Sequence, residues 1–135
     1  MSKKSLRMRI GVAALAITMM SCTMSAFAAT DFSGFSFSLP GFNGSKYTAY
    51  QKKTTTGATE EVEDYKSGAK ANVDARMIDK DGDAGPWTRN LNQGASSYVL
   101  EGKSTLKENE DVRAQFSSDI TTTVAVDISG KWRSN

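Results

Sequence analysis

Apolar and polar residues alternate with a period of two along much of this chain. Residues 35–39 (FSFSL) alternate strictly, and residues 69–77 place Ala, Val and Met on one side and Lys, Asn, Asp and Arg on the other. Residues 120–128 (ITTTVAVDI) have β-branched side chains at seven of nine positions, and such side chains suit a pleated surface. Because successive side chains of a strand point to opposite faces, this pattern predicts strands with one buried face.

Further strands are predicted wherever short apolar-rich segments lie between turn-forming residues. Residues 104–111 are predicted to form a loop, although Ser104, Lys107 and Glu108 are compatible with the start of one helical turn. The additional predicted strands are residues 46–53, 60–65, 87–91, 97–101 and 112–116.

The segments together predict an all-β fold, a single antiparallel β-sandwich of about eight short strands. No helical pattern is long enough to connect two parallel strands, so neighbouring strands are expected to run antiparallel. If residues 120–128 form a strand at a sheet edge, that edge is open to pairing with a second copy, but the sequence does not define an oligomeric state.

The beginning of the chain has the features of a secretory signal peptide. Residues 1–9 contain four basic residues and no acidic residue, and an apolar run follows up to about Met24. Ala26 and Ala28 are small residues at the positions that signal peptidase reads, so cleavage is predicted after Ala28. A membrane anchor needs roughly 20 consecutive apolar residues, whereas this run is shorter and contains Thr, Ser and Cys.

The predicted domains are therefore a signal peptide at residues 1–28 and a β-sandwich at residues 29–135, secreted and extracellular, with no stable membrane span. The alternative is a lipid anchor at Cys22. It is the weaker prediction, because Met19 and Met20 occupy the positions where a lipobox prefers leucine and a small residue.

Cleavage changes the sign of the net charge. Four of the 17 Lys and Arg residues lie in residues 1–28, so 13 remain against all 15 Asp and Glu residues, and the net charge goes from +2 to −2. The basic character thus belongs to the export signal, and no nucleic-acid partner is expected.

The predicted secreted part has neither His nor Cys, which excludes several kinds of catalytic site. Ser-His-Asp triads, cysteine nucleophiles and zinc sites with nitrogen or sulfur ligands all need those side chains. A glycosidase needs only two carboxylates, but the acidic residues within 60–64 and 108–111 are predicted to be solvated. We therefore expect no enzyme activity, no catalytic residue and no cofactor.

One acidic cluster matches the beginning of an EF-hand calcium loop. Asp79, Asp81 and Asp83 occupy the first, third and fifth positions of such a loop. The sixth position is Ala84, where glycine is needed, and the twelfth is Asn90, where a glutamate is needed. A β-turn between two strands is therefore favoured, and a calcium site is the weaker alternative.

Aromatic residues are the candidates for a binding surface. Carbohydrate and peptide sites often use an exposed Trp or Tyr, although most aromatic residues of a small sandwich fill its core. Phe42, Trp87 and Trp132 are the residues predicted for such a surface, and Phe42, in a glycine-rich turn, is the one most expected to be exposed.

Four short segments stand out along the chain: Tyr-x-x-Tyr at residues 47–50, Lys-Lys-Thr-Thr-Thr at residues 52–56, DVRAQF at residues 111–116 and the ending Ser-Gly-Lys-Trp at residues 129–132. With these segments, most of residues 35–135 resembles a family of small exported proteins from Gram-positive bacteria. Members of this family end in a strand followed by Ser-Gly-x-Trp. Their function is unassigned, and the resemblance implies no catalytic residue.

In size, export and all-β character this family is similar to the lactococcin-type bacteriocins, from which the present chain differs in having no His and fewer aromatic residues. We therefore expect a secreted, non-catalytic β-sandwich that binds an unknown ligand at the cell envelope or in the extracellular medium. The alternative is a bacteriocin-like antimicrobial protein that acts on competing Gram-positive bacteria.

Overall fold

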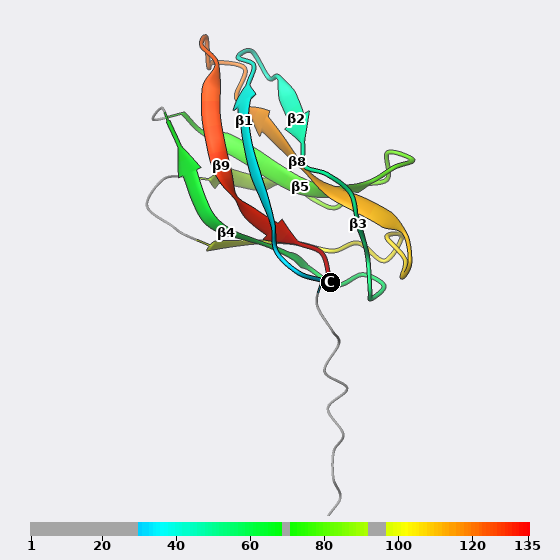
Figure 1. The fold of residues 1–135 in the computed structure, drawn as a ribbon. Coiled ribbons are helices and arrows are strands. Elements are labelled where there is room, and N and C mark those ends of the chain that lie inside the picture. Colours follow the sequence, from blue (N-terminus) through cyan, green and yellow to red (C-terminus); the bar gives the residue numbers. More distant parts are fainter. Residues whose placement is uncertain (1–29, 69–70, 92–96) are drawn as a thin grey trace, which may run out of the picture.

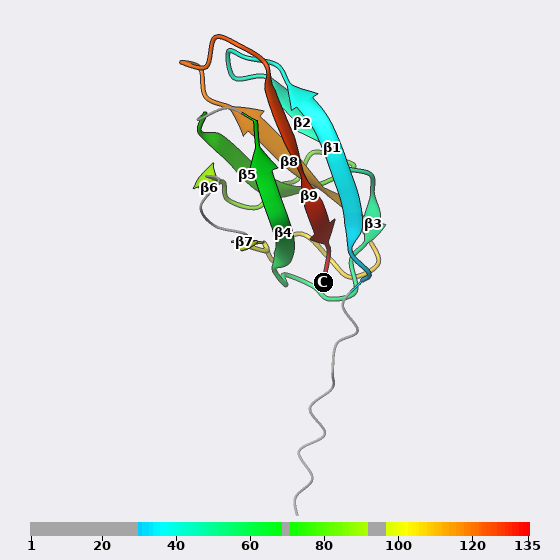
Figure 2. The ribbon, with the colours of Figure 1, turned by 60° about the vertical axis from the view of Figure 1, so that its left-hand side comes forward.

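The computed structural model describes residues 30–68, 71–91 and 97–135, which form an all-β structure. Nine strands pair into two antiparallel sheets that face each other, which confirms the predicted β-sandwich (Figures 1 and 2). Among the described residues, no helix is long and apolar enough to cross a membrane. The predicted signal peptide, with Cys22, lies outside the described residues.

The first sheet has four strands, in the order β1-β9-β4-β7. The pairing of β9 with both β1 and β4 places the C-terminal strand in the middle of this sheet. The strands are β1 (Ser33–Leu39), β9 (Val126–Arg133), β4 (Glu60–Ser67) and β7 (Ser97–Leu100).

The second sheet has five strands, in the order β2-β8-β5-β6, and β3 also pairs with β8. The predicted strand at residues 46–53 is thus two short strands, and both pair with β8. The strands are β2 (Ser45–Tyr47), β3 (Gln51–Lys52), β8 (Asp111–Ser118), β5 (Val73–Asp79) and β6 (Thr88–Leu91). Residues 104–110, before β8, form turns, as predicted.

The core lies between the two sheets and consists of the inward-facing residues of both. The ring of Phe116 in β8 lies 4.8 Å from that of Phe35 in β1, measured between centroids, so the two sheets meet through aromatic contacts. Complete burial of one such large apolar side chain contributes roughly 1.5–3 kcal/mol to stability. The sequence contains a single cysteine, so no disulfide can form within the chain, and the packing of this core stabilises the sandwich.

The predicted strand at residues 120–128 is wrong for residues 120–125 and confirmed only for residues 126–128. β9 begins only at Val126, and the preceding residues form a turn and loop in which Ile120 is 72% and Val124 60% exposed. The reason is topological: β8 and β9 belong to different sheets, so the chain must cross between sheets after Ser118. The connection overrides the β propensity of the Thr-rich segment, and the edge-to-edge pairing expected from that strand is lost with it.

The prediction that Trp132 belongs to a binding surface is also wrong, because its side chain is only 1% exposed. Trp132 shares the inward face of β9 with Val126 and Ile128, which are both buried. β9 is a central strand, so a large side chain on its inner face lies within the core.

Candidate binding face

The outer face of the five-stranded sheet carries arginine and aromatic side chains in one continuous series of contacts. In β8, Val112, Ala114 and Phe116 are fully buried in the interior. The alternation of a strand therefore directs Arg113 and Gln115 to the outer face.

Arg113 lies against two tyrosines. Its guanidinium carbon is 4.0 Å from the ring centroid of Tyr47 and 4.6 Å from that of Tyr50. The rings remain 40% and 45% exposed, respectively. Such cation–π contacts contribute about 0.5–1 kcal/mol at exposed sites and fix the orientation of both partners.

Gln115 connects this cluster to the next strand. Its amide nitrogen donates a hydrogen bond to the Tyr47 hydroxyl at 3.2 Å, and its amide oxygen accepts one from the Arg76 Nε at 2.7 Å. Gln115 points away from the core but is only 7% exposed, so the neighbouring side chains form a layer over it.

The series ends at β6, around Trp87. The guanidinium carbon of Arg76 is 4.3 Å from the Trp87 ring centroid, and that of Arg89 is 5.6 Å away. Arg89 forms an ion pair with the buried carboxylate of Asp74, which also accepts a hydrogen bond of 2.9 Å from the backbone N–H of Asn90.

We refer to this surface as the arginine–aromatic face. Its three arginines contact one acidic residue, Asp74, so the face carries a net charge of +2, whereas residues 29–135 as a whole have a net charge of −2. A nearby pair at the edge, Lys52 and Asp111, is neutral overall. The residues of the face are Tyr47, Tyr50, Arg76, Trp87, Arg89 and Arg113.

The predicted binding residues are therefore separated. Trp87 belongs to the arginine–aromatic face and is partly buried beneath two arginines. Phe42 lies elsewhere, at a loop, and is 68% exposed, which confirms the expected exposure. Sequence reasoning missed the arginines, although Arg76 and Arg113 both occupy outward phases of predicted strands.

The acidic residues proposed as a calcium site hold a turn instead. One carboxylate oxygen of Asp79 accepts the backbone N–H groups of Asp81 at 2.9 Å and Asp83 at 2.8 Å. The Asp83 carboxylate pairs with Lys103, and Asp81 pairs with Lys80. No group of three His, Cys, Asp or Glu residues that could hold a metal occurs among the described residues.

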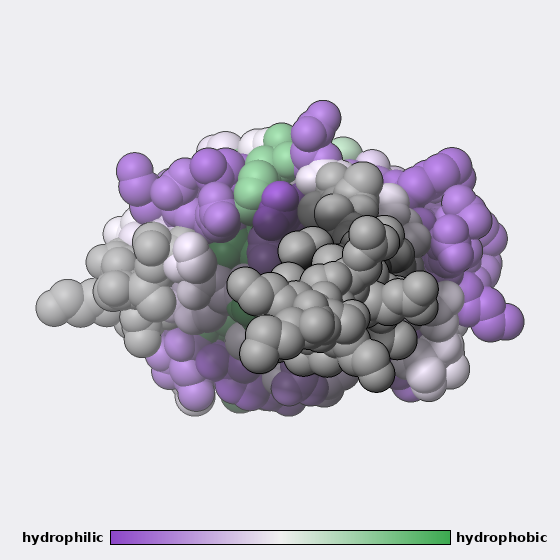
Figure 3. Space-filling model, turned by 90° about the horizontal axis from the view of Figure 1, so that it is seen from below, coloured by the Kyte–Doolittle hydropathy of each residue, from purple (hydrophilic) through white to green (hydrophobic). Residues whose placement is uncertain are grey.

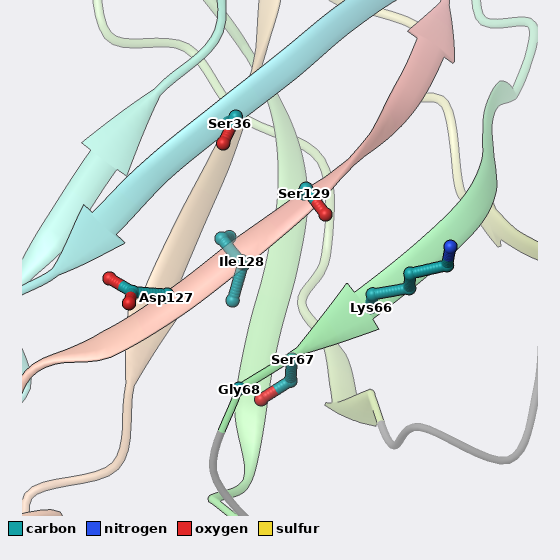
Figure 4. Close-up of a pocket in the computed structure, with 7 residues that line it drawn as sticks. All are labelled: Ser36, Lys66, Ser67, Gly68, Asp127, Ile128 and Ser129. Carbon is teal, nitrogen blue, oxygen red and sulfur yellow. The ribbon is translucent and has the colours of Figure 1, made fainter.

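A shallow hollow lies on the outer face of the other sheet, across β1, β9 and β4. Its volume is about 240 Å³. Lys66 and Asp127 lie on opposite sides of Ser129 (Figure 4). Small hydroxyl side chains, one ammonium group and one carboxylate line it, so the hollow holds no pair of carboxylates of the kind that a glycosidase uses.

The prediction that the acidic residues at 60–64 are solvated is wrong for Glu60, which is fully buried at the start of β4. Burial raises the pKa of its carboxyl to about 8, while the charge of nearby Lys53 acts in the opposite direction. Neither carboxyl oxygen has a hydrogen-bond partner among the residues that the structure describes. The Lys53 ammonium, itself 1% exposed, donates to the backbone oxygens of Ala58 at 2.7 Å and Asn135 at 3.1 Å.

The loop between β1 and β2 and the loop between β8 and β9 lie at the end of the sandwich opposite the C-terminus (Figures 1 and 2). The first carries the exposed Phe42 and the second the exposed Ile120 and Val124, and we refer to these three residues as the apolar tip. The two loops are joined by a hydrogen bond from the Phe42 N–H to the Thr122 oxygen at 2.7 Å. Phe42 has a φ of 56°, an uncommon conformation for a bulky residue, and its ring gains no burial in return.

The other end of the molecule differs from this tip. Where described residues are visible in Figure 3, the end that carries the C-terminus is largely hydrophilic, with a small hydrophobic area among the polar residues. The three most exposed large apolar side chains, Phe42, Ile120 and Val124, all belong to the loops that connect β1 to β2 and β8 to β9.

The geometry offers two candidate contact surfaces, one flat and cationic, the other small and apolar. Compared with known proteins, the chain matches no family and no curated protein in sequence.

Proposed function

We propose that the protein is an exported, non-catalytic binding protein of the bacterial cell envelope or its surroundings, and that the arginine–aromatic face holds its ligand. One observation carries this proposal: aromatic rings and guanidinium groups are in continuous contact across the outer face of the five-stranded sheet, from Tyr50 to Arg89. The signal peptide and the resemblance to exported Gram-positive proteins belong to the same proposal.

The construction of the face suits recognition. Tyr47 and Tyr50 present exposed ring area, and Arg113 holds both rings in place. Side chains that are already ordered lose little entropy when a ligand arrives, so a rigid sheet surface binds more tightly than a mobile one of equal composition. A flat, open face suits an extended ligand better than a small molecule, which binds in concave pockets.

We expect the purified exported protein to sediment with isolated Gram-positive cell envelopes. The Tyr47→Ala/Tyr50→Ala variant should bind at least about tenfold more weakly, because loss of 1.4 kcal/mol already gives that factor. Val99→Ala is the matched control, since Val99 is 54% exposed on the other sheet. Equal sedimentation of all three proteins would contradict the proposed role of the face.

The second candidate function is a bacteriocin-like antimicrobial activity, and the apolar tip is the observation that favours it. Exposed large apolar side chains on loops held by backbone hydrogen bonds are suited to entering the interfacial region of a bilayer. In this case the protein would act on the membranes of competing Gram-positive cells.

For this second function, the protein should release dye from lipid vesicles and inhibit the growth of sensitive strains. Phe42→Ser should reduce both effects at least fivefold, because it removes the aromatic ring of the apolar tip. Val99→Ser should leave both effects unchanged. Absence of dye release and of growth inhibition across a broad panel of strains would exclude the antimicrobial function and leave envelope binding as the proposal.

A further inference from the structure

We infer that the ligand of the arginine–aromatic face is an envelope polyanion, a polymer whose repeating units carry phosphate or carboxylate groups. This inference rests on the proposed function, which it makes more specific. It predicts that the arginines, and not the rings alone, select the ligand.

The charge of the face supports a polyanion. The acidic residue in contact with its arginines, Asp74, is largely buried and already accepts hydrogen bonds from Arg89 and from the backbone N–H of Asn90, and Asp111 at the edge is paired with Lys52. Among the described residues, no ion pair includes Arg76 or Arg113. Two guanidinium groups therefore lack a carboxylate partner in the part of the chain that the structure describes.

The outer face of the four-stranded sheet provides an internal comparison. There Lys131 and Arg133 also lie over an aromatic ring, that of Phe32, at 5.2 and 4.5 Å. Each is paired with acidic residues: Lys131 with Glu63 at 3.4 Å, and Arg133 with Glu61 at 2.7 Å. Cation–π packing is common to both sheets, whereas uncompensated positive charge is found on the five-stranded sheet.

Arg113 is the residue best placed to contact an anion. Its guanidinium lies over the Tyr47 and Tyr50 rings, and its Nε is buried without a hydrogen-bond partner among the described residues, so a ligand can be met only by the two terminal Nη groups. A guanidinium that stacks through its flat face keeps the N–H groups of its edge available, and this edge matches a carboxylate or phosphate with two parallel hydrogen bonds.

The spacing of the arginines favours a polymer over a single anion. The two arginines without an ion pair, Arg113 on β8 and Arg76 on β5, lie on neighbouring strands, where Arg76 is opposite Gln115. Diagonal positions of this kind are separated by about 7–8 Å. Two charged groups of one extended chain can bind there together, and the second contact then benefits from the first.

The test measures binding of the exported protein to polyphosphate, polygalacturonate and neutral dextran by calorimetry at low and high salt. We expect at least one polyanion to bind at least tenfold more tightly than dextran, with an affinity that falls steeply between about 50 and 500 mM salt. Binding of polyphosphate alone identifies phosphate as the recognised group, and binding of polygalacturonate alone identifies carboxylate.

Arg113→Gln should lower the polyanion affinity at least tenfold, and Arg113→Lys should keep part of it because the charge remains. Arg133→Gln is the matched control, since Arg133 also lies over an aromatic ring but is paired with Glu61. The unsubstituted protein alone already tests the inference through the dextran and salt comparisons, even if a variant fails to fold.

Three results would overturn the inference: dextran bound as tightly as the polyanions, an Arg113→Gln variant with unchanged affinity, or single-stranded DNA bound more tightly than either polymer. The proposed function has a separate readout. If the tyrosine variants no longer sediment with envelopes but no polyanion binds, the function stands and the ligand is neutral. If envelopes do not bind at all, the function itself fails.

Discussion

The Glu60→Gln variant is expected to be more stable than the unsubstituted protein at pH 8 and about equally stable at pH 5. Burial raises the pKa of the Glu60 carboxyl from 4.5 to about 8 in the folded protein. Between these two values, folded Glu60 keeps its proton whereas unfolded Glu60 has released it. The folded state thus binds more protons than the unfolded state, so raising the pH in this window stabilises the unfolded state.

The expected size of this effect is large for one side chain. Each pH unit within the window lowers the free energy of unfolding by roughly 1 kcal/mol, against a total of about 5–15 kcal/mol for a typical domain. Lys53 has the opposite effect at alkaline pH. Burial lowers its pKa from 10.5, so the folded protein releases this proton at a lower pH than the unfolded protein does. Between the lowered pKa and 10.5, stability therefore rises with pH. Glu60→Gln removes the first effect and also removes the carboxylate charge that raises the Lys53 pKa, so the effect of Lys53 burial remains without this opposition.

Urea unfolding at pH 5, 6.5 and 8 measures the effect directly. The unsubstituted protein should lose stability across the series, Glu60→Gln should not, and the control Glu101→Gln, at an exposed position, should follow the unsubstituted protein. A stability that is constant with pH in the unsubstituted protein would show that Glu60 is already ionised in the fold, compensated by Lys53.

Period-two alternation was sufficient to predict most strands, because each sheet has one buried face and hydrophobic phase is then strongly constrained. The alternation also indicates the direction of the Glu60 side chain. This residue is in phase with Val62, which is fully buried, so the alternation of β4 directs both side chains inward. Its charge led to the prediction of a solvated residue, although the phase of the strand indicated burial.

The Thr-rich segment shows where local pattern is not enough. Residues 120–125 have strong β propensity, yet they connect two sheets, and only the partners of β8 and β9 reveal that the chain must cross there. The choice between strand and crossover depends on pairings with residues far away in sequence, which local propensity does not contain.

The arginine–aromatic face could not be predicted for a related reason. Its residues come from four separate segments, and the order β2-β8-β5-β6 brings them together although only β5 and β6 are consecutive in the chain. Alternation alone assigns Arg76 and Arg113 to outward positions. Their approach to Trp87 and Tyr47 depends on strand order and register.

Trp132→Ala is expected to lower the free energy of unfolding by about 3–5 kcal/mol, the range seen when a large buried aromatic side chain is truncated. Trp132 lies on the inner face of the central strand β9, opposite Ser33 of β1 and Val62 of β4 in the register of the sheet. Neighbours in a sheet cannot collapse far into the space it leaves, because their backbones are held by ladder hydrogen bonds on both sides.

Trp87→Ala is the matched control, because the chain contains only these two tryptophans and Trp87 lies outside the core. It should cost less than about 1 kcal/mol, as for most surface substitutions. Each variant also retains a single tryptophan, whose emission can be measured selectively. Trp87→Ala should emit at short wavelength from buried Trp132, and Trp132→Ala at longer wavelength from partly exposed Trp87. Equal losses of stability, or the reverse order of emission, would mean that β9 does not direct Trp132 into the core, and the register of the four-stranded sheet would then be wrong.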